Sequence, residues 1–252
     1  MLDYSVNNSN ASWYGEDLID YAGRSVSSAG DVNGDGFDDI LIGAYGNDDG
    51  LTGAGQTYLI LGHNNTWQNN INLGNVNSSW WGEDSVDYSG RSISSAGDVN
   101  GDGFDDIIIG ADGDEDGGDD AGQTYLILGH NGSWQMDNDL SNANASWYGE
   151  HESDESGESV SGAGDVNGDG FDDILIGAPD NDEGGSWAGQ VYLILGHNGT
   201  WQMDNNVSEV NASWWGEDTS DDAGASVSGA GDVNGDGSVS YTHLTLPTTP
   251  YV

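Results

Sequence analysis

The sequence predicts an all-β fold made of β-propeller blades with four antiparallel strands each, because a long unit recurs and short strand-like segments fill it. One nine-residue stretch, Asp-Val-Asn-Gly-Asp-Gly-Phe-Asp-Asp, occurs at 31–39, 98–106 and 165–173, each copy starting 67 residues after the one before. An apolar triplet follows every copy, as at 40–42, and no segment has helical periodicity. A strand that is apolar on both faces must be covered on both faces, as blades stacked around an axis are.

Each unit of 67 residues contains about four candidate strands. An aromatic pair opens the unit (Trp13-Tyr14 in the first), and a small-residue segment at 23–30 suits a crowded innermost strand. The apolar triplet and the segment 56–62 supply two more strands, and a His-Asn-x-Thr/Ser-Trp-Gln turn closes the unit. We predict three full blades and part of a fourth within residues 1–237, which form an incomplete ring.

The repeated loop has the donor pattern of a calcium site. Oxygen-bearing side chains stand at positions 1, 3, 5 and 9, a backbone carbonyl is available at position 7, and glycine at position 6 permits the sharp turn. We predict three Ca²⁺ sites with these ligands: Asp31, Asn33, Asp35, Phe37 and Asp39; Asp98, Asn100, Asp102, Phe104 and Asp106; Asp165, Asn167, Asp169, Phe171 and Asp173. The alternative is an Asn-Gly or Asp-Gly hairpin turn whose acids serve solubility.

A partial fourth loop and a divergent tail end the chain. Residues 232–237 keep the first six loop positions, but Ser240 stands at position 9, so we expect weak binding or none. Residues 238–252 contain no Asp, Glu or Gly and break off the repeat inside the motif. We interpret them as a non-native, adapter-like tail, against the alternative of a natural tail of unusual composition. The chain begins inside a repeat, so we expect the natural N-terminus and any signal peptide to lie outside it.

The charge excludes several kinds of partner. The chain has 45 acidic residues against two arginines and no lysine, a formal net charge of −43. Nucleic acid and anionic membranes repel such a protein, and no apolar run reaches the roughly 20 residues that span a bilayer. Three loops account for only a small part of the acidity, which therefore predicts a solvated surface suited to a saline or halophilic habitat. The absence of cysteine excludes disulfides.

The repeat resembles the FG-GAP repeat family, which includes the blades of the integrin α-subunit propeller. Residues 157–192 carry the resemblance best, with Gly-Glu-Ser-Val at 157–160, the acidic loop, and Gly-Ala-Pro at 177–179. The phenylalanine of the Phe-Gly half is replaced by Ala22, Ser89, Ser156 and Ala223. The resemblance implies a secreted or cell-surface calcium-binding module for adhesion or ligand recognition, whose partner is an extracellular protein or glycan. Open blade edges would also allow self-association.

Other residue patterns favour structural roles over catalysis. His63, His130 and His197 occupy equivalent turns, and a catalytic base is not needed three times, so we predict no enzyme activity in this chain. His151 stands where other units have aspartate, a change that we interpret as drift. We assign the tryptophans to packing rather than to sugar stacking. Trp187 has no aromatic counterpart in the other units, and loops that differ between repeats are where propellers place recognition, so residues 184–188 are the predicted ligand contact.

Two alternatives from other functional classes remain. The propeller could be the non-catalytic part of a larger secreted hydrolase or carbohydrate-binding protein. Alternatively, Asp-Val-Asn-Gly-Asp-Gly also opens dockerin-like assembly loops, but these need an acid at position 12, where this chain has Ile42, Ile109 and Ile176.

Overall fold

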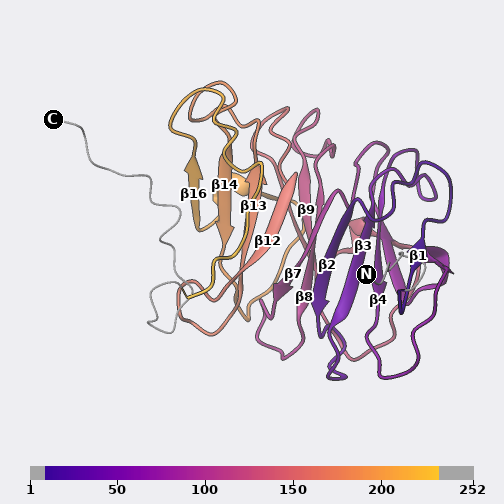
Figure 1. The fold of residues 1–252 in the computed structure, drawn as a ribbon. Coiled ribbons are helices and arrows are strands. Elements are labelled where there is room, and N and C mark those ends of the chain that lie inside the picture. Colours follow the sequence, from indigo (N-terminus) through magenta and orange to yellow (C-terminus); the bar gives the residue numbers. More distant parts are fainter. Residues whose placement is uncertain (1–8, 233–252) are drawn as a thin grey trace, which may run out of the picture.

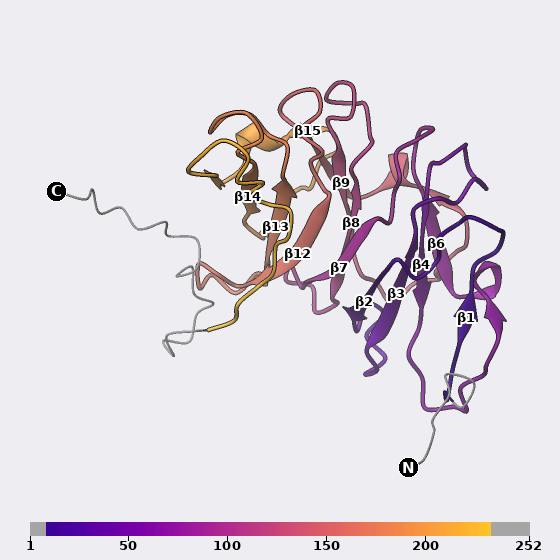
Figure 2. The same cartoon turned by 45° about the horizontal axis from the view of Figure 1, so that its top comes forward.

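Three antiparallel sheets stand side by side as propeller blades in the computed structural model, which describes residues 9–232 (Figures 1 and 2). The blades follow one another in chain order and form no closed ring within the described residues. The all-β blade prediction is therefore confirmed. The predicted tail at 238–252, and the partial fourth loop beyond Asp232, lie outside the described residues.

Each blade contains four antiparallel strands, ordered from the inner to the outer edge as the chain runs. The strands are β2 (Ser25–Gly30), β3 (Asp39–Ala44), β4 (Gln56–Ile60) and β6 (Ser78–Trp81) in the first blade; β7 (Ser92–Gly97), β8 (Asp106–Ala111), β9 (Gln123–Ile127) and β11 (Ala145–Tyr148) in the second; β12 (Ser159–Gly164), β13 (Asp173–Ala178), β14 (Gln190–Ile194) and β16 (Ala212–Trp215) in the third. The inner strands β2, β7 and β12 lie next to one another.

The aromatic pair that opens each sequence unit completes the sheet of the unit before it. In β6, Trp80 stands opposite Thr57 of β4, and Trp81 stands opposite Gln56. β1 (Trp13–Tyr14) instead pairs in parallel with β5 (Ile71–Asn72). The blades are thus offset from the sequence units, and each blade takes its outermost strand from the chain segment that leads into the next blade.

A short parallel strand joins neighbouring blades, which the sequence analysis did not predict. β10 (Asn138–Asp139) pairs with β6, and β15 (Asn205–Asn206) pairs with β11. Each short strand runs into a 3-10 turn: η2 (Leu73–Asn75), η3 (Leu140–Asn142) or η4 (Val207–Glu209). The carboxylate of Asp139 accepts the N–H of Ser141 at 2.9 Å, a side-chain cap of the kind that starts helical turns.

The core lies between the blades, because the central strands bury both faces. Leu41 of the first blade packs with Ile107 and Ile109 of the second, whereas Ile108 packs with Ile174 of the third. Successive residues of a strand point to opposite faces, so one apolar triplet serves two interfaces. This confirms the reading of the triplets as strands that are covered on both sides.

The inner strands are crowded, as their small residues predicted. Ala29 is fully buried, and Gly30 adopts φ +75°. A Cβ on Gly30 would lie 2.2 Å from Oδ2 of Asp105 in the next blade, so a larger residue does not fit.

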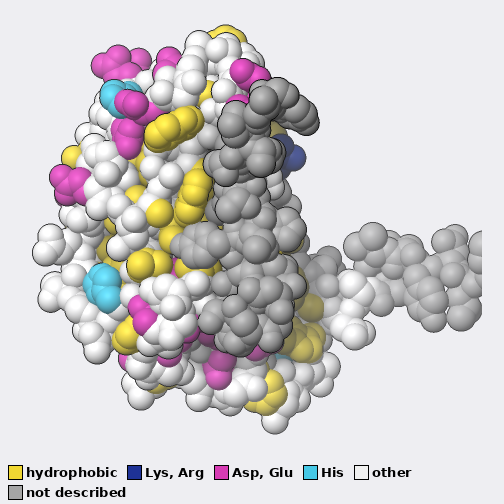
Figure 3. Space-filling model, turned by 90° about the vertical axis from the view of Figure 1, so that its left-hand side faces the viewer, with side chains coloured by type: hydrophobic (Ala, Val, Ile, Leu, Met, Phe, Trp, Pro, Cys, Tyr) yellow, Lys and Arg dark blue, Asp and Glu magenta, His cyan; other side chains and the backbone are white. Residues whose placement is uncertain are grey.

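Acidic and hydrophobic side chains share the surface of the third blade (Figure 3). Hydrophobic side chains form a band there, and aspartate and glutamate side chains lie around it. Leu175, Val191 and Leu193 form the hydrophobic cluster of this blade, with Trp214 packed against it. Self-association through blade edges stays a prediction.

Candidate metal-binding loops

The three predicted calcium loops connect the first and second strands of each blade. Loop 31–39 lies between β2 and β3, loop 98–106 between β7 and β8, and loop 165–173 between β12 and β13. Because the blades repeat, all three lie at the same end of the sheets, towards the lower edge of Figure 1. Neighbouring strands run antiparallel, so the loops after β3, β8 and β13 lie at the opposite end.

The side chains at positions 1, 3 and 5 gather on the inside of each loop. In the first loop, Oδ1 of Asp31 and Oδ1 of Asn33 both accept the N–H of Asp35, at 3.0 and 2.8 Å. Oδ1 of Asp35 accepts the N–H of Phe37 at 3.0 Å. The second and third loops repeat these bonds within 0.1 Å. The loop backbone therefore holds three oxygen-bearing side chains together.

The aspartate at position 9 is buried below the loop. Oδ2 of Asp39 accepts the N–H of Val32 at 3.0 Å, and Oδ1 accepts the N–H of Gly62 at 2.7 Å. Asp106 and Asp173 make the same pair of bonds. Burial raises the pKa of Asp39 and of Asp173 to about 6, and that of Asp106 to about 7, although the amide bonds oppose the shift.

The donor set fits a hard cation. Positions 1, 3 and 5 offer carboxylate and amide oxygens, the ligands that Ca²⁺ prefers. The three predicted aspartate ligands of one loop do not all lie within 4.8 Å of one another. Within residues 9–232, one group of three Asp, Glu or His side chains lies that close, and it is outside the loops. Asp39 instead accepts hydrogen bonds from two backbone amides. Each of its oxygens keeps a second lone pair, which is available to a cation. The fifteen ligand assignments stay a prediction.

Neighbouring loops contact each other, a feature that the sequence analysis missed. Oδ2 of Asp105, at position 8 of the second loop, accepts the N–H of Asp31 in the first loop at 2.8 Å. The ring of Phe104 lies against Gly34, where a Cβ would be 2.6 Å from Cε1. The third loop contacts the second in the same way, through Asp172 to Asp98 at 2.9 Å and Phe171 against Gly101. The loops therefore form a continuous row across the blades.

The repeated histidines make structural contacts, as predicted. His63, His130 and His197 stack on Trp67, Trp134 and Trp201 with ring centroids 4.1–4.2 Å apart. These indoles make T-shaped contacts with Trp13, Trp80 and Trp147, with ring centroids 5.9–6.0 Å apart. Both kinds of contact occupy part of each ring, which favours packing over sugar stacking; the assignment stays a prediction.

Trp187 is placed differently. Its side chain is 56% exposed, and its backbone adopts φ +54°. The N–H of Trp187 donates to Oδ1 of Asp182 at 2.7 Å, which fixes the turn that presents the indole. An exposed indole on a fixed turn is compatible with the predicted ligand contact at 184–188, which stays a prediction.

The two arginines differ in their pairing. Arg91 pairs with Asp112 and lies 3.5 Å from Glu158. Burial raises the pKa of Asp112 to about 7, and the charge of Arg91 opposes this shift. Arg24 makes no ion pair with any residue in the described part of the chain.

The second blade contains a buried carboxyl cluster that the sequence analysis did not single out. The hydroxyl of Tyr125 lies 2.6 Å from Oε1 of Glu83 and 2.9 Å from Oδ2 of Asp114. A hydroxyl has one hydrogen, so one of these two contacts requires a protonated carboxyl. Burial raises the pKa of Glu83 to about 7, of Asp114 to about 6 and of Asp87 nearby to about 8. The sequence contains one signal for this cluster: Asp114 stands where the other two units have Asn47 and Asn181.

The comparisons with known proteins agree with the blade architecture. The FG-GAP repeat model matches residues 22–60, 89–127 and 156–194, which cover β2–β4, β7–β9 and β12–β14. Integrin alpha pat-2 of Caenorhabditis briggsae is 31% identical over 238 residues, 89% of this chain and 17% of the relative. Integrin alpha-5 of Xenopus laevis is 35% identical over 162 residues, 62% of this chain and 14% of the relative.

A third relative is named as an enzyme. Phosphatidylinositol-glycan-specific phospholipase D of Dictyostelium discoideum is 29% identical over 198 residues, 72% of this chain and 20% of the relative. The chain thus spans a fifth or less of the length of these three relatives. Within residues 9–232, no helix has the length and apolar character needed to cross a membrane. With three matched repeats and integrin alpha relatives along most of its length, the chain belongs to the FG-GAP repeat family and has an integrin-alpha-like propeller fold.

Proposed function

We propose that this chain is an extracellular calcium-binding propeller module that serves adhesion or ligand recognition. The observation that carries the proposal is the row of three equivalent loops, each with oxygen-bearing side chains held together at positions 1, 3 and 5. A cation bound in each loop would stabilise the contacts between blades as well, because each loop touches the loop of the neighbouring blade.

The charge of the loops supports a cation. Each loop brings four aspartates into nine residues, and like charges held this close repel one another. No lysine exists in the chain to neutralise them, and neither arginine pairs with a loop aspartate in the described part of the chain. A bound Ca²⁺ would supply the missing positive charge and make loop formation part of folding.

Recognition of the partner is assigned to the other end of the third blade. Trp187 lies on the loop between β13 and β14, opposite in the blade to the acidic loop before β13. An exposed indole suits an extracellular protein or a glycan. The names of the integrin alpha relatives favour a cell-surface protein, and this proposal takes that location for the present chain.

A role without catalysis is favoured by the same relatives. The phospholipase D relative supports the second candidate, a propeller that forms the non-catalytic part of a larger hydrolase. The dockerin-like alternative has less support, because the acidic loops lead directly into β3, β8 and β13, whereas a dockerin loop leads into a helix.

The test is thermal unfolding in high salt with Ca²⁺, with Mg²⁺ and with a chelator. A ligand at 100 times its dissociation constant stabilises the folded state by about 2.7 kcal/mol per site, so three sites should raise the midpoint by many degrees. Asp35→Ala should reduce this gain by at least one third, whereas Glu217→Ala, which removes one exposed carboxylate outside the loops, should keep it. Equal midpoints with calcium and chelator would contradict the metal assignment.

The ligand contact has its own test. Trp187→Ala removes an exposed side chain, so the free energy of unfolding should change by less than about 0.5 kcal/mol. Binding to immobilised extracellular-matrix proteins and to glycan arrays should weaken at least tenfold if the indole contacts the partner. Wild-type binding by the variant would remove Trp187 from the proposed surface.

A further inference from the structure

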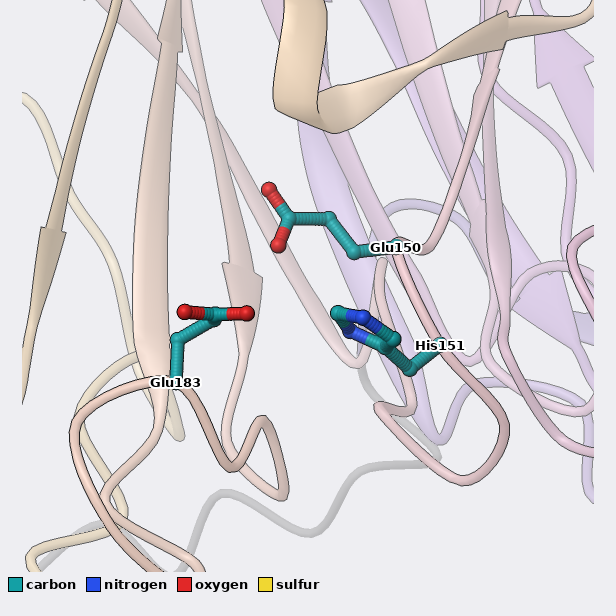
Figure 4. A group of neighbouring side chains, drawn as sticks. All are labelled: Glu150, His151 and Glu183. Carbon is teal, nitrogen blue, oxygen red and sulfur yellow. The ribbon is translucent and has the colours of Figure 1, made fainter.

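Three side chains at the end of the third blade opposite its acidic loop offer a different kind of donor set. Glu150 and His151 follow β11, and Glu183 lies in the loop between β13 and β14. Their ligand atoms all lie within 4.8 Å of one another. Figure 4 shows the two carboxylates and the imidazole directed toward the same space from two loops.

The imidazole is specific to this unit. The positions of Glu150, His151 and Glu183 hold Glu16, Asp17 and Asp49 in the first unit, and Glu83, Asp84 and Asp116 in the second. The third unit therefore differs at two of three positions, gaining a nitrogen donor and a carboxylate with a longer reach. Within residues 9–232, this is the one group of three such side chains that lie so close together.

A buried carboxylate lies near the imidazole. Oδ2 of Asp154 is 3.9 Å from Nδ1 of His151, and the side chain of Asp154 is 3% exposed. Asp154 is itself held by the N–H of His151 at 3.0 Å and by Nδ2 of Asn181 at 2.9 Å. At 3.9 Å this contact is longer than a hydrogen bond, so it is an electrostatic one. A carboxylate next to a metal-bound histidine commonly orients the ring.

The electrostatics favour a cation between the two loops. The carboxylates of Glu150 and Glu183 lie within 4.8 Å of each other, and like charges this close repel. The chain has no lysine, and neither arginine pairs with Glu150 or Glu183 in residues 9–232. A divalent ion would relieve this repulsion and would join the segment after β11 to the loop before β14.

We propose that Glu150, His151 and Glu183 bind one divalent transition-metal ion of the zinc, nickel or cobalt class. One imidazole with two carboxylates suits these metals, whereas Ca²⁺ prefers oxygen donors alone. Metal–ligand distances of about 2.0–2.2 Å require the exposed side chains to close by a rotamer change, and water completes the coordination. This site is independent of the calcium loops, since it lies at the other end of the blade and uses a different donor chemistry.

The experiment is a calorimetric Ni²⁺ titration of the untagged chain in excess Ca²⁺, which occupies sites made of oxygen alone. The matched variant His151→Asp restores the residue of the other units and should fold, so it isolates the imidazole. We expect one Ni²⁺ per wild-type chain, and at least tenfold weaker binding in both His151→Asp and Glu183→Gln, with unchanged melting temperatures in the absence of Ni²⁺. The His151 ring protons should broaden first when paramagnetic Ni²⁺ is added. Equal Ni²⁺ binding by wild type and His151→Asp, or broadening of other histidines first, would overturn the proposal.

Discussion

The buried carboxyl cluster of the second blade allows a quantitative prediction for Asp114→Asn. Asp114 is 2% exposed, and its carboxylate accepts the N–H of Asp116 at 2.9 Å. Asparagine fits this position, because Asn47 and Asn181 each accept the equivalent N–H through Oδ1 and donate through Nδ2 to the tyrosine hydroxyl of their own blades, at 3.2 and 3.3 Å. The substitution therefore keeps the geometry and removes one ionisable group.

The magnitude and the sign follow from the pKa of Asp114. Burial raises it from 3.8 to about 6 in the folded protein, and the neighbouring charges of Asp116 and Asp84 act in the same direction. A folded pKa above the unfolded one means that the folded state favours the proton. Protonation of Asp114 therefore adds to the free energy of unfolding. This contribution is present below pH 4 and is lost as the pH rises through 6. At 1.36 kcal/mol for each pKa unit, the loss approaches about 3 kcal/mol at pH 8.

Asp114→Asn should therefore stabilise the protein at pH 8 by up to about 3 kcal/mol and have little effect at pH 4. Urea unfolding at pH 4, 6 and 8, with salt and calcium held constant, measures the difference. The reverse change Asn181→Asp places a carboxyl beside Tyr192 and should introduce a loss of stability at pH 8. A gain that is the same at all three pH values, or a loss at pH 8, would refute the reasoning.

Two further predictions concern the contacts between loops. Gly34→Ala places a Cβ 2.6 Å from the phenylalanine ring of the next loop, so it should lower the free energy of unfolding by about 1–3 kcal/mol more than Gly36→Ala does. Gly36 has a similar positive φ, but a Cβ there would meet no atom within 4 Å. Chemical denaturation measures both losses, and equal losses would show that the ring moves aside. Asp105→Ala removes the acceptor for the first N–H of the preceding loop and should lower the free energy of unfolding by about 1–3 kcal/mol. The side chain of Asp38 makes no hydrogen bond within the described part of the chain, so Asp38→Ala should change the free energy of unfolding by less than about 0.5 kcal/mol. Similar losses in both variants would contradict the coupling of the loops.

The blade was predictable from the sequence because its signals are local and repeated. The triplet at 40–42 has no alternation, which requires cover on both faces, and the structure divides Leu41 and Ile42 between different hydrophobic clusters. The small residues at 29 and 30 likewise indicated the inner strand. Three copies of each pattern made the assignment of strands firm.

Other features depend on pairing over long distances and had no local signal. The strand at Trp80-Trp81 could be recognised, but which sheet it joins is decided by its register with β4. The two-residue parallel strands have too few residues to show a period of two. The grouping of Glu150 and His151 with Glu183 requires two loops to meet across 32 residues of sequence, so His151 was interpreted as drift.

The position of Asp105 gives calcium binding a consequence beyond its own loop. Asp105 lies between two predicted ligands, Phe104 and Asp106, while its carboxylate holds the first N–H of loop 31–39. Ordering of the second loop by a cation would therefore also order the N–H of Asp31, itself a predicted ligand. Each filled site should then make the neighbouring site easier to fill, since part of the ordering entropy is already lost. Calcium titrations should show positive cooperativity in the wild type, and Asp105→Ala should remove it between the first two sites.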